Sequence, residues 1–200
     1  QKGDYHPEQE QSFAPAICNR LDRNTEGLVL AAKDAVTLRE LNRLIRENRI
    51  QKTYLCVLTA TPPKQTDILH AYHWKDAKTN TVTISDRPKA GYREIITEYR
   101  VLQQQNGLCL AEITLHTGRT HQIRAHMAHI GAPLAGDSKY GNRQKNESLH
   151  LKHQLLCAYQ LQFHPEADSC LAYLNRKTVT APLSDFVSRF FPTFSSKNRK

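Results

Sequence analysis

The chain has 200 residues, a length that suits one domain with a buried core. Its 28 Lys and Arg against 19 Asp and Glu give a formal net charge of +9, which favours a nucleic-acid ligand over an anionic membrane surface. No apolar run approaches the ~20 residues of a membrane span, and no signal peptide is visible. The five widely spaced cysteines indicate reduced thiols. We therefore expect a cytoplasmic protein without a membrane partner.

The two ends of the chain are polar. Residues 1–15 have a loop-like composition and begin with Gln, so we expect the chain to start within a larger protein. Residues 195–200 are a basic tail, expected to be disordered. No repeat or linker divides the rest, and residues 1–200 are therefore interpreted as a single catalytic domain.

The first half of the chain predicts a strand, a helix and a second strand. Residues 28–32 form a short apolar run, typical of a buried strand that follows a turn at 24–27. Residues 35–48 carry leucines at helical spacing, and Asp34 is the expected cap of that helix. Residues 53–58 are apolar on both faces, which predicts a central strand.

The second half is dominated by predicted hairpins. An edge ribbon is expected at 68–73 and 81–85, and a hairpin with a Gln-Asn-Gly turn is expected at 94–103 and 107–116. A further strand is expected at 155–163, followed by a short helix at 184–190 that Ser184 caps. Hairpins with helices inserted between them predict an α+β fold with a largely antiparallel sheet.

Residues 120–130 predict a further helix, closed by Gly131. Its apolar face is expected to pack on the sheet and consists of Ile123, His126, Met127 and Ile130. Arg124 falls beside that face with His121, where a guanidinium can form a two-point pair with a buried carboxylate. Arg119 lies at the positive end of this helix, a natural place for phosphate.

One carboxylate, Asp22, stands between two guanidinium groups, Arg20 and Arg23. A surface that attracts phosphates normally excludes acids, and nearby positive charge favours the ionised form of a carboxylate. Such a group suits a nucleophile or an electrostatic catalyst. A helix cap or a surface ion pair is the ordinary alternative.

The remaining reactive side chains have ordinary interpretations. Tyr54 reads as a sheet tyrosine whose hydroxyl finds a partner, and Cys18 as a packing residue. The histidines raise the question of zinc, but HExxH and CxxC patterns are absent. We therefore expect core and surface histidines and no metal. A zinc-dependent nucleic-acid enzyme is the alternative on these residues.

Four segments together resemble the RluA-type RNA pseudouridine synthase family. They are Asn19-Arg20-Leu21-Asp22-Arg23-Asn24-Thr25-Glu26-Gly27-Leu28; Lys52-Thr53-Tyr54; Gly118-Arg119-Thr120-His121-Gln122-Ile123-Arg124-Ala125-His126; and Leu155-Leu156-Cys157-Ala158 with Phe163-His164-Pro165. The likeness extends from about residue 17 to residue 165, and the Gly118–Arg124 element is its most specific part.

The resemblance implies roles for individual residues. Asp22 would be the catalytic aspartate, Tyr54 the tyrosine that packs on the target base, Arg124 the partner that holds Asp22, and Leu156 an apolar wall. Further substrate-binding residues would be Arg20, Arg23, Arg119, His121 and Gln122. The implied fold is an antiparallel mixed sheet with inserted helices and a central active-site cleft.

The implied reaction converts specific uridines of structured RNA to pseudouridine, with no cofactor and no catalytic metal. A carboxylate can stabilise or capture the positive charge that develops on ribose, or remove a ribose proton, and both routes stay open. The base must be flipped out of the RNA. Ribosomal RNA is the expected partner and transfer RNA the second, with a monomeric enzyme. A non-catalytic RNA-binding module that keeps only the basic groove is the alternative.

The chain departs from the family pattern at four positions near the motifs. Asn19 replaces a usual His, Asn24 a common Asp, Glu26 a small residue, and Cys157 a common His. These changes bear on substrate preference. The family's upstream Lys-Pro strand and S4-like domain are not seen before Gln1, which indicates a catalytic-domain fragment.

Overall fold

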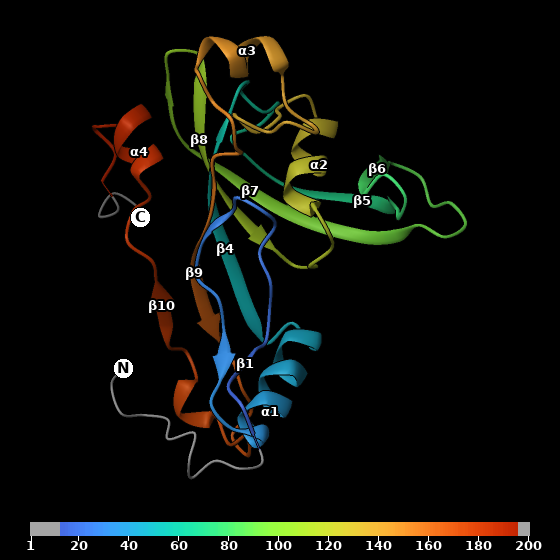
Figure 1. Cartoon of the computed structure of the whole chain (residues 1–200), viewed down its shortest axis with the longest axis vertical. Helices are drawn as coiled ribbons and strands as arrows, with labels where there is room; N and C mark the ends of the chain where they lie inside the picture. Colours follow the sequence, from blue (N-terminus) through green and yellow to red (C-terminus); the bar gives the residue numbers. More distant parts are fainter. Residues whose placement is uncertain (1–12, 196–200) are drawn as a thin grey trace.

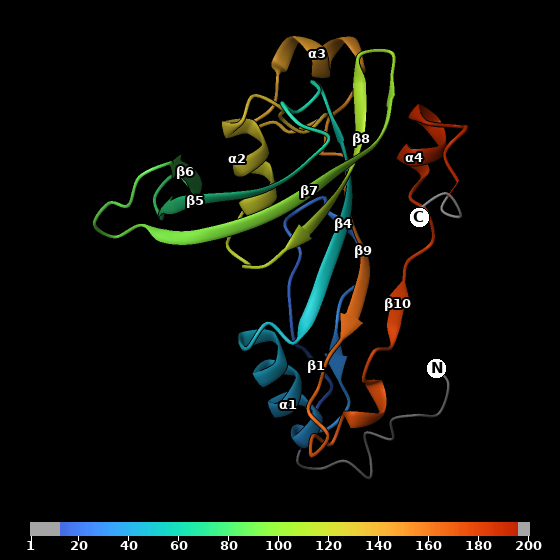
Figure 2. The same ribbon diagram turned by 180° about the vertical axis from the view of Figure 1, so that it is seen from behind.

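One twisted sheet runs through the molecule and carries helices on both faces (Figures 1 and 2). The structure is a computed structural model that describes residues 13–195, so most of the predicted loop at 1–15 and all but the first residue of the tail at 195–200 lie outside the described residues. The strand order is β10-β9-β4-β8-β7-β5-β6, with β2 beside β9. The strands are β2 (Glu26–Gly27), β4 (Ile50–Leu58), β5 (Thr66–Asp76), β6 (Thr81–Ser85), β7 (Arg93–Gln105), β8 (Leu108–Leu115), β9 (Leu156–Phe163) and β10 (Thr178–Thr180).

The predicted α+β class with a largely antiparallel mixed sheet is confirmed. Every pairing in the large sheet is antiparallel except that of β2 with β9. β4 is the central strand that the apolar run at 53–58 predicts, because it pairs with β8 on one side and β9 on the other. The β5–β6 ribbon at the sheet edge is also confirmed and extends away from the body (Figure 1).

Both faces of the central strands are covered. Helix α2 (Gln122–His129) packs its Ile123 and Met127 on one face, and helix α4 (Asp185–Phe190) packs Phe186 and Val187 on the other. Alternate residues of β4 therefore enter different cores: Cys56 lies on the α2 side and Leu55 on the α4 side. This explains why the strand is apolar throughout.

Helix α1 (Ala35–Arg46) lies at the far end of the sheet. Its predicted cap is confirmed, since the Asp34 carboxylate accepts the backbone N–H of Thr37 at 2.7 Å. Leu41 and Leu44 are buried against the ends of β4 and β9. Helix α3 (Arg143–Ser148) and the short 3₁₀ turn Ala172–Leu174 were not predicted.

The prediction of a buried strand at 28–32 is wrong. Only β3 (Ala31–Ala32) is extended, and it pairs with the two-residue β1 (Ala16–Ile17) outside the large sheet. Leu28 and Leu30 pack on the α1 core, whereas Val29 is 46% exposed, so the apolar run covers the core edge as a loop.

The start of one helix and the capping bond of another differ from their predictions. Helix α2 begins at Gln122, because His121 adopts a left-handed conformation (φ 51°) that ends the preceding loop. Ser184 occupies the cap position of α4, but its hydroxyl donates to the Glu26 carboxylate instead of capping the helix. None of the helices among residues 13–195 has the length and apolar character that a membrane crossing requires.

Candidate active site

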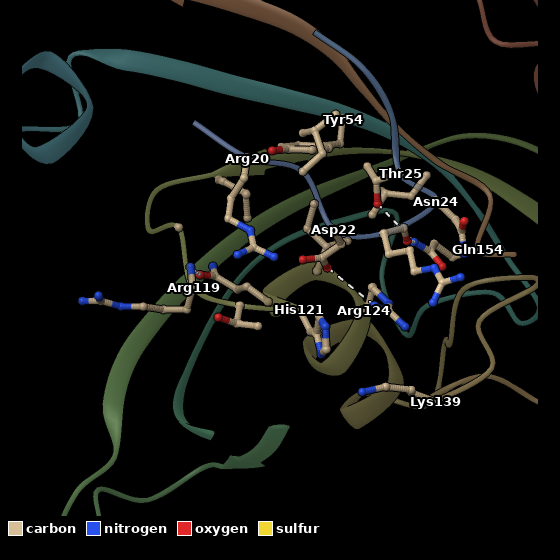
Figure 3. A pocket seen from close by; sticks show the side chains of 18 of the residues that line it. Arg20, Asp22, Asn24, Thr25, Tyr54, Arg119, His121, Arg124, Lys139 and Gln154 are labelled. Carbon is tan, nitrogen blue, oxygen red and sulfur yellow. Dashed lines mark hydrogen bonds and ion pairs between the residues drawn. The ribbon is translucent and has the colours of Figure 1, made fainter. Parts of the chain in front are cut away.

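A cleft of roughly 720 Å³ opens where the loop before β2, strand β4 and the start of α2 meet (Figure 3). Its walls come from segments far apart in the sequence: residues 19–25, 52, 54, 118–124, 138–139, 152–154 and 156 contribute. The Asp22 carboxylate points into this space toward Arg124, with His121 beside it.

The loop that carries Asp22 is fixed to the sheet by β2. Gly27 lies against Ala158 of β9, where a Cβ at position 27 would be 2.2 Å from the Ala158 carbonyl oxygen. The φ of Gly27 is +106°, a value that side chains rarely allow. The Leu28 N–H then donates to the same carbonyl at 2.9 Å. Glycine is thus required for the loop to approach β9 this closely.

The turn after Asp22 is held by Gln154. Its amide nitrogen donates to the Arg23 carbonyl at 2.6 Å and to the Thr25 hydroxyl at 3.2 Å. The Thr25 N–H donates to the Asp22 carbonyl at 3.0 Å, and this closes the turn. The Asp22 side chain is 24% exposed, so the carboxylate is accessible from the cleft while its backbone is fixed.

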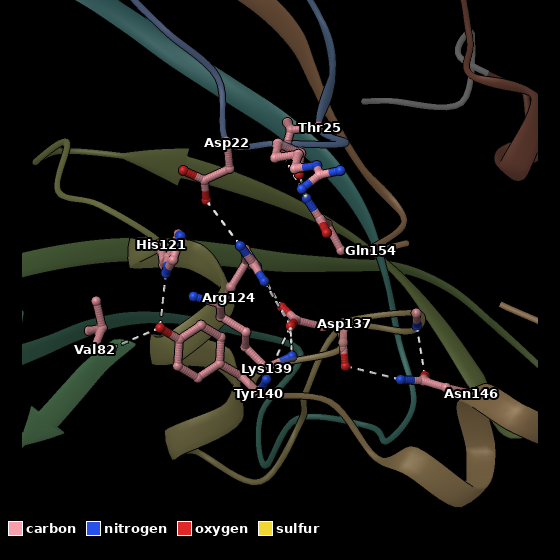
Figure 4. A network of polar contacts seen from close by, with 12 residues as sticks. Asp22, Thr25, Val82, His121, Arg124, Asp137, Lys139, Tyr140, Asn146 and Gln154 are labelled. Carbon is pink, nitrogen blue, oxygen red and sulfur yellow. Dashed lines mark hydrogen bonds and ion pairs between the residues drawn. The ribbon is translucent and has the colours of Figure 1, made fainter. Parts of the chain in front are cut away.

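Arg124 is the buried cation beside Asp22. Its Nη1 lies 3.6 Å from the Asp22 Oδ2, and only 6% of the side chain is exposed. The predicted pairing of these two residues is therefore present, but as a one-point ion pair. The two-point partner of Arg124 is Asp137, at 2.6 Å from Nε and 2.9 Å from Nη2 (Figure 4).

Asp137 is fully buried, and its carboxylate accepts four hydrogen bonds from three residues. Besides Arg124 it accepts the backbone N–H groups of Lys139 at 2.8 Å and Tyr140 at 3.0 Å. Burial alone would raise the pKa of Asp137, but the hydrogen bonds and charge of Arg124 bring it below its ordinary value. Asp137 therefore stays ionised and fixes the direction of the guanidinium.

Tyr140 connects this pair to His121. Its hydroxyl lies 2.9 Å from His121 Nδ1 and accepts the Val82 N–H at 2.8 Å, and its ring lies 5.4 Å from the Arg124 guanidinium carbon. Burial lowers the pKa of His121, although the Asp22 charge opposes this. His121 is thus a neutral or weakly basic group with a fixed ring.

Tyr54 and Leu156 form an apolar wall above Asp22. Tyr54 lies on β4 at a bulge, because Thr53 pairs with Gln160 while Tyr54 pairs with Ala158. Burial and the Asp22 charge raise the pKa of Tyr54 to about 12, so the phenol keeps its proton at neutral pH. Leu156 is 3% exposed and lines the same cleft.

Comparison with known proteins identifies the family. The family model described as RNA pseudouridylate synthase matches residues 1–129. The chain belongs to this family. An uncharacterized RNA pseudouridine synthase of Chloroflexus aurantiacus is 36% identical over 157 residues, which cover 76% of this chain and 47% of that protein. The ribosomal large subunit pseudouridine synthase C of Rickettsia conorii is 36% identical over 129 residues, 64% of this chain and 42% of that protein.

The fold agrees with the family. Human RNA pseudouridylate synthase domain containing 1 superimposes with a TM-score of 0.72 at 21% identity, covering 96% of this chain and 81% of that structure. Human RNA pseudouridylate synthase domain containing 4 gives 0.69 at 20% identity, covering 88% and 74%. The chain spans about half the length of the curated relatives it matches.

The cleft brings together the residues that the sequence singles out. Arg20, Arg23 and Arg119 line it with Asp22. Gln122 also borders it, but its side chain is engaged within the protein: Oε1 accepts from Thr117 and the Arg119 backbone, and Nε2 donates to Ile96 and Thr97. Its geometry favours a positioning role over the predicted substrate contact.

Sequence reasoning missed three cleft-forming or supporting residues, Asp137, Lys139 and Gln154, and assigned no role to Lys52 of the Lys52-Thr53-Tyr54 segment. Asp137 had a recognisable signal, since Gly-Asp-Ser after a helix is typical of a carboxylate that bonds backbone amides two and three residues ahead. The histidines form no group of three potential metal ligands with other His, Cys, Asp or Glu side chains in residues 13–195. His126 is buried, and its Nδ1 lies 3.0 Å from the Thr97 hydroxyl.

Departures from the family pattern are structural contacts in this chain. Asn19 accepts the Leu30 N–H at 2.7 Å, and Asn24, in a left-handed conformation (φ 66°), lies 3.0 Å from His153 Nδ1. Glu26 binds the Ser184 hydroxyl and so joins the Asp22 loop to α4. All three contacts support the loop that presents Asp22.

The cleft is strongly cationic. Within residues 13–195, Asp22 is the one carboxylate that lines the cleft, and eight lining side chains are Lys or Arg. The cations are Arg20, Arg23, Lys52, Lys75, Arg119, Arg124, Lys139 and Lys152. Such a wall attracts a polyanion and repels cationic ligands. The arrangement can hold phosphates around a single reactive carboxylate.

Proposed function

We propose that the protein isomerises specific uridines to pseudouridine in structured RNA, with Asp22 as the catalytic carboxylate. The observation that carries this proposal is the isolation of one accessible carboxylate in a cleft lined by eight cations. Binding alone needs no acid at that position, since a carboxylate opposes phosphate binding. Membership of the RNA pseudouridylate synthase family gives the same reaction.

The chemistry requires a carboxylate at the ribose. The N1–C1′ bond of uridine breaks, the uracil turns within the pocket, C5 bonds to C1′, and the C5 proton is replaced by one on N1. Asp22 acts on the ribose while the glycosidic bond is open, either by capturing C1′ or by removing a ribose proton. All substrate atoms are retained, so the reaction calls for no cosubstrate.

Arg124 and Asp137 aim the carboxylate. Asp137 occupies Nε and Nη2 of the guanidinium, which leaves Nη1 facing Asp22 at 3.6 Å. Because both members of the Arg124–Asp137 pair are buried, the guanidinium has little freedom to move. A positioned cation orients the Asp22 carboxylate toward the ribose.

Tyr54 and Leu156 receive the flipped base. They offer an aromatic and an aliphatic surface next to Asp22, which suits stacking and apolar contact with uracil. The cationic side chains around them would hold the phosphates on either side of the flipped nucleotide. The volume of roughly 720 Å³ accommodates one nucleotide with its flanking backbone.

We further propose ribosomal RNA as the substrate and transfer RNA as the second candidate. Supporting this choice, relatives from Rickettsia conorii and Rickettsia felis carry the name ribosomal large subunit pseudouridine synthase C. Lys139 and Lys152, which lie outside the family segments, and the Asn24–His153 pair, in which Asn24 departs from the family pattern, would select among RNAs.

The test is to incubate the full-length protein with unmodified transcripts of ribosomal and transfer RNA and to map pseudouridine in each. New pseudouridine at a few uridines of large-subunit ribosomal RNA supports the proposal. Tight RNA binding without any new pseudouridine would instead identify a non-catalytic RNA-binding module. Pseudouridine in transfer RNA alone would support the proposed reaction and reject ribosomal RNA as the substrate.

A further inference from the structure

Lys52 is a half-buried cation on the cleft wall to which no individual role has been assigned above. It lies on β4 two residues before Tyr54, between Leu115 of β8 and Leu161 of β9 in the register. Its side chain lines the cleft on the same face of the strand as Tyr54. Burial lowers the pKa of Lys52 below its ordinary value.

The Lys52 ammonium has neither a carboxylate partner nor a hydrogen-bond acceptor within residues 13–195. Of the other cleft cations, Arg124 is paired with Asp137 and Asp22, and Lys139 donates to the Asn80 carbonyl at 2.7 Å. The remaining five, Arg20, Arg23, Lys75, Arg119 and Lys152, are exposed to solvent, which Lys52 is not. A desolvated ammonium without a partner costs free energy in the folded state. This cost is recovered when an anion binds beside it.

The surroundings of Lys52 indicate which anion. Its Nζ lies 3.9 Å from the position that a Cβ on Gly118 would occupy, so the ammonium sits against the loop that leads to Arg119. Arg20 and Arg119 line the same side of the cleft, opposite Arg124 (Figure 3). Two residues along a strand span about 6.5 Å, which sets Lys52 apart from the base-stacking position at Tyr54.

We infer that Lys52 is the ligand for one backbone phosphate of the RNA next to the flipped uridine, in a subsite completed by Arg20 and Arg119. Lysine binds phosphate as a point charge and needs no two-point geometry, which suits a side chain that reaches through an apolar strand pair. This inference rests on the proposed function only for the identity of the nucleotide. The binding of phosphate itself does not depend on turnover.

The experiment measures RNA affinity, turnover and stability for Lys52→Met, with Lys52→Arg as the conservative variant and Lys33→Met as the control. Lys33 is exposed beside α1 and does not line the cleft. The probe is a hairpin cut around a mapped pseudouridine site, with a single methylphosphonate on the 5′ or 3′ side of the target uridine. If the wild-type protein converts no RNA, the probe is instead the ribosomal RNA fragment that binds with the lowest Kd. That fragment then carries a single methylphosphonate at successive positions.

Lys52→Met is expected to raise Kd roughly tenfold and to reduce the salt dependence of binding by about one phosphate. One of the methylphosphonates should weaken wild-type binding by a similar factor and Lys52→Met binding hardly at all. Lys52→Arg should restore affinity, and Lys52→Met should unfold at the same or a higher temperature, because an unpaired buried charge is removed.

Three results would overturn the inference. The first is an unchanged Kd for Lys52→Met, and the second is an equal methylphosphonate effect in wild type and variant. The third is a fall in kcat with Kd unchanged, which would mean that Lys52 stabilises charge on the departing uracil. Absence of pseudouridine in every RNA tested rejects the proposed function and leaves the affinity measurements to decide on Lys52.

Discussion

Replacing Asp137 by Asn is expected to destabilise the protein strongly, because it breaks a fully buried ion pair without changing its shape. The carboxylate is 0% exposed and holds Arg124 at 2.6 and 2.9 Å. In the variant, Arg124 keeps only Asp22 at 3.6 Å, and an amide group faces its N–H donors. Removing one partner of a buried pair costs about 3–5 kcal/mol.

For a domain of this size each kcal/mol lowers Tm by ~2–4 °C, so Asp137→Asn should lower it by roughly 6–20 °C. The assay is thermal unfolding followed by circular dichroism. Glu147→Gln is the control, because it breaks the exposed Arg143–Glu147 pair and should shift Tm by less than about 2 °C. At a temperature where Asp137→Asn is folded, its turnover should fall because Arg124 no longer points at Asp22. A Tm within about 2 °C of the wild type would refute the account of how Arg124 is held.

Three further predictions follow from single positions. Gly27→Ala should unfold more easily and lose activity, because its Cβ would lie 2.2 Å from the Ala158 carbonyl oxygen. Gly107→Ala is the control, since Gly107 also has a positive φ but open space around it, and its free energy of unfolding should fall by only ~1 kcal/mol in urea. Burial, reinforced by the charge of His129, lowers the pKa of His126 to about 4. The free energy of unfolding should therefore fall by up to ~3 kcal/mol between pH 6.5 and pH 4. His126→Gln should reduce this pH dependence, measured by urea unfolding at each pH. Because the pKa of Tyr54 is about 12, the pH–rate profile from pH 7 to 10 should keep its shape in Tyr54→Phe.

The sign of the His126 effect follows from which state binds protons. Between pH 4 and 6.5 the unfolded chain protonates this histidine while the folded protein keeps it neutral. Stability is therefore complete above about pH 6.5 and is lost as the pH falls. Stability that is constant across this window would contradict the neutral, buried state of His126.

Local patterns predicted the regular elements well. Asn106 and Gly107 both have positive φ, as the two-residue turn between β7 and β8 requires. An Asn-Gly pair between two strand-like segments predicts such a turn from the sequence. The central position of β4 followed from its apolar residues on both faces. Residues 28–32 were misjudged because an apolar run does not distinguish a strand from a loop that covers a core edge.

The candidate site was predicted only in part. Asp22, Tyr54 and Arg124 were recognised from motifs, but a motif does not reveal which carboxylate an arginine binds. Asp137 is thirteen residues from Arg124 in the sequence and reaches it through a loop. That Lys52 lacks a partner in residues 13–195 is likewise visible only when the side chains around it are placed, because its segment does not show what the ammonium contacts.

The most direct test of the central claim is the rate of pseudouridine formation by Asp22→Asn, measured on a mapped RNA site beside the affinity for the same RNA. The variant keeps the shape of the side chain and removes the one carboxylate of the cationic cleft. We expect no detectable pseudouridine and an affinity equal to or slightly above that of the wild type, because a negative charge has left a phosphate-binding surface. Turnover retained by Asp22→Asn would remove Asp22 from the chemistry and contradict the account.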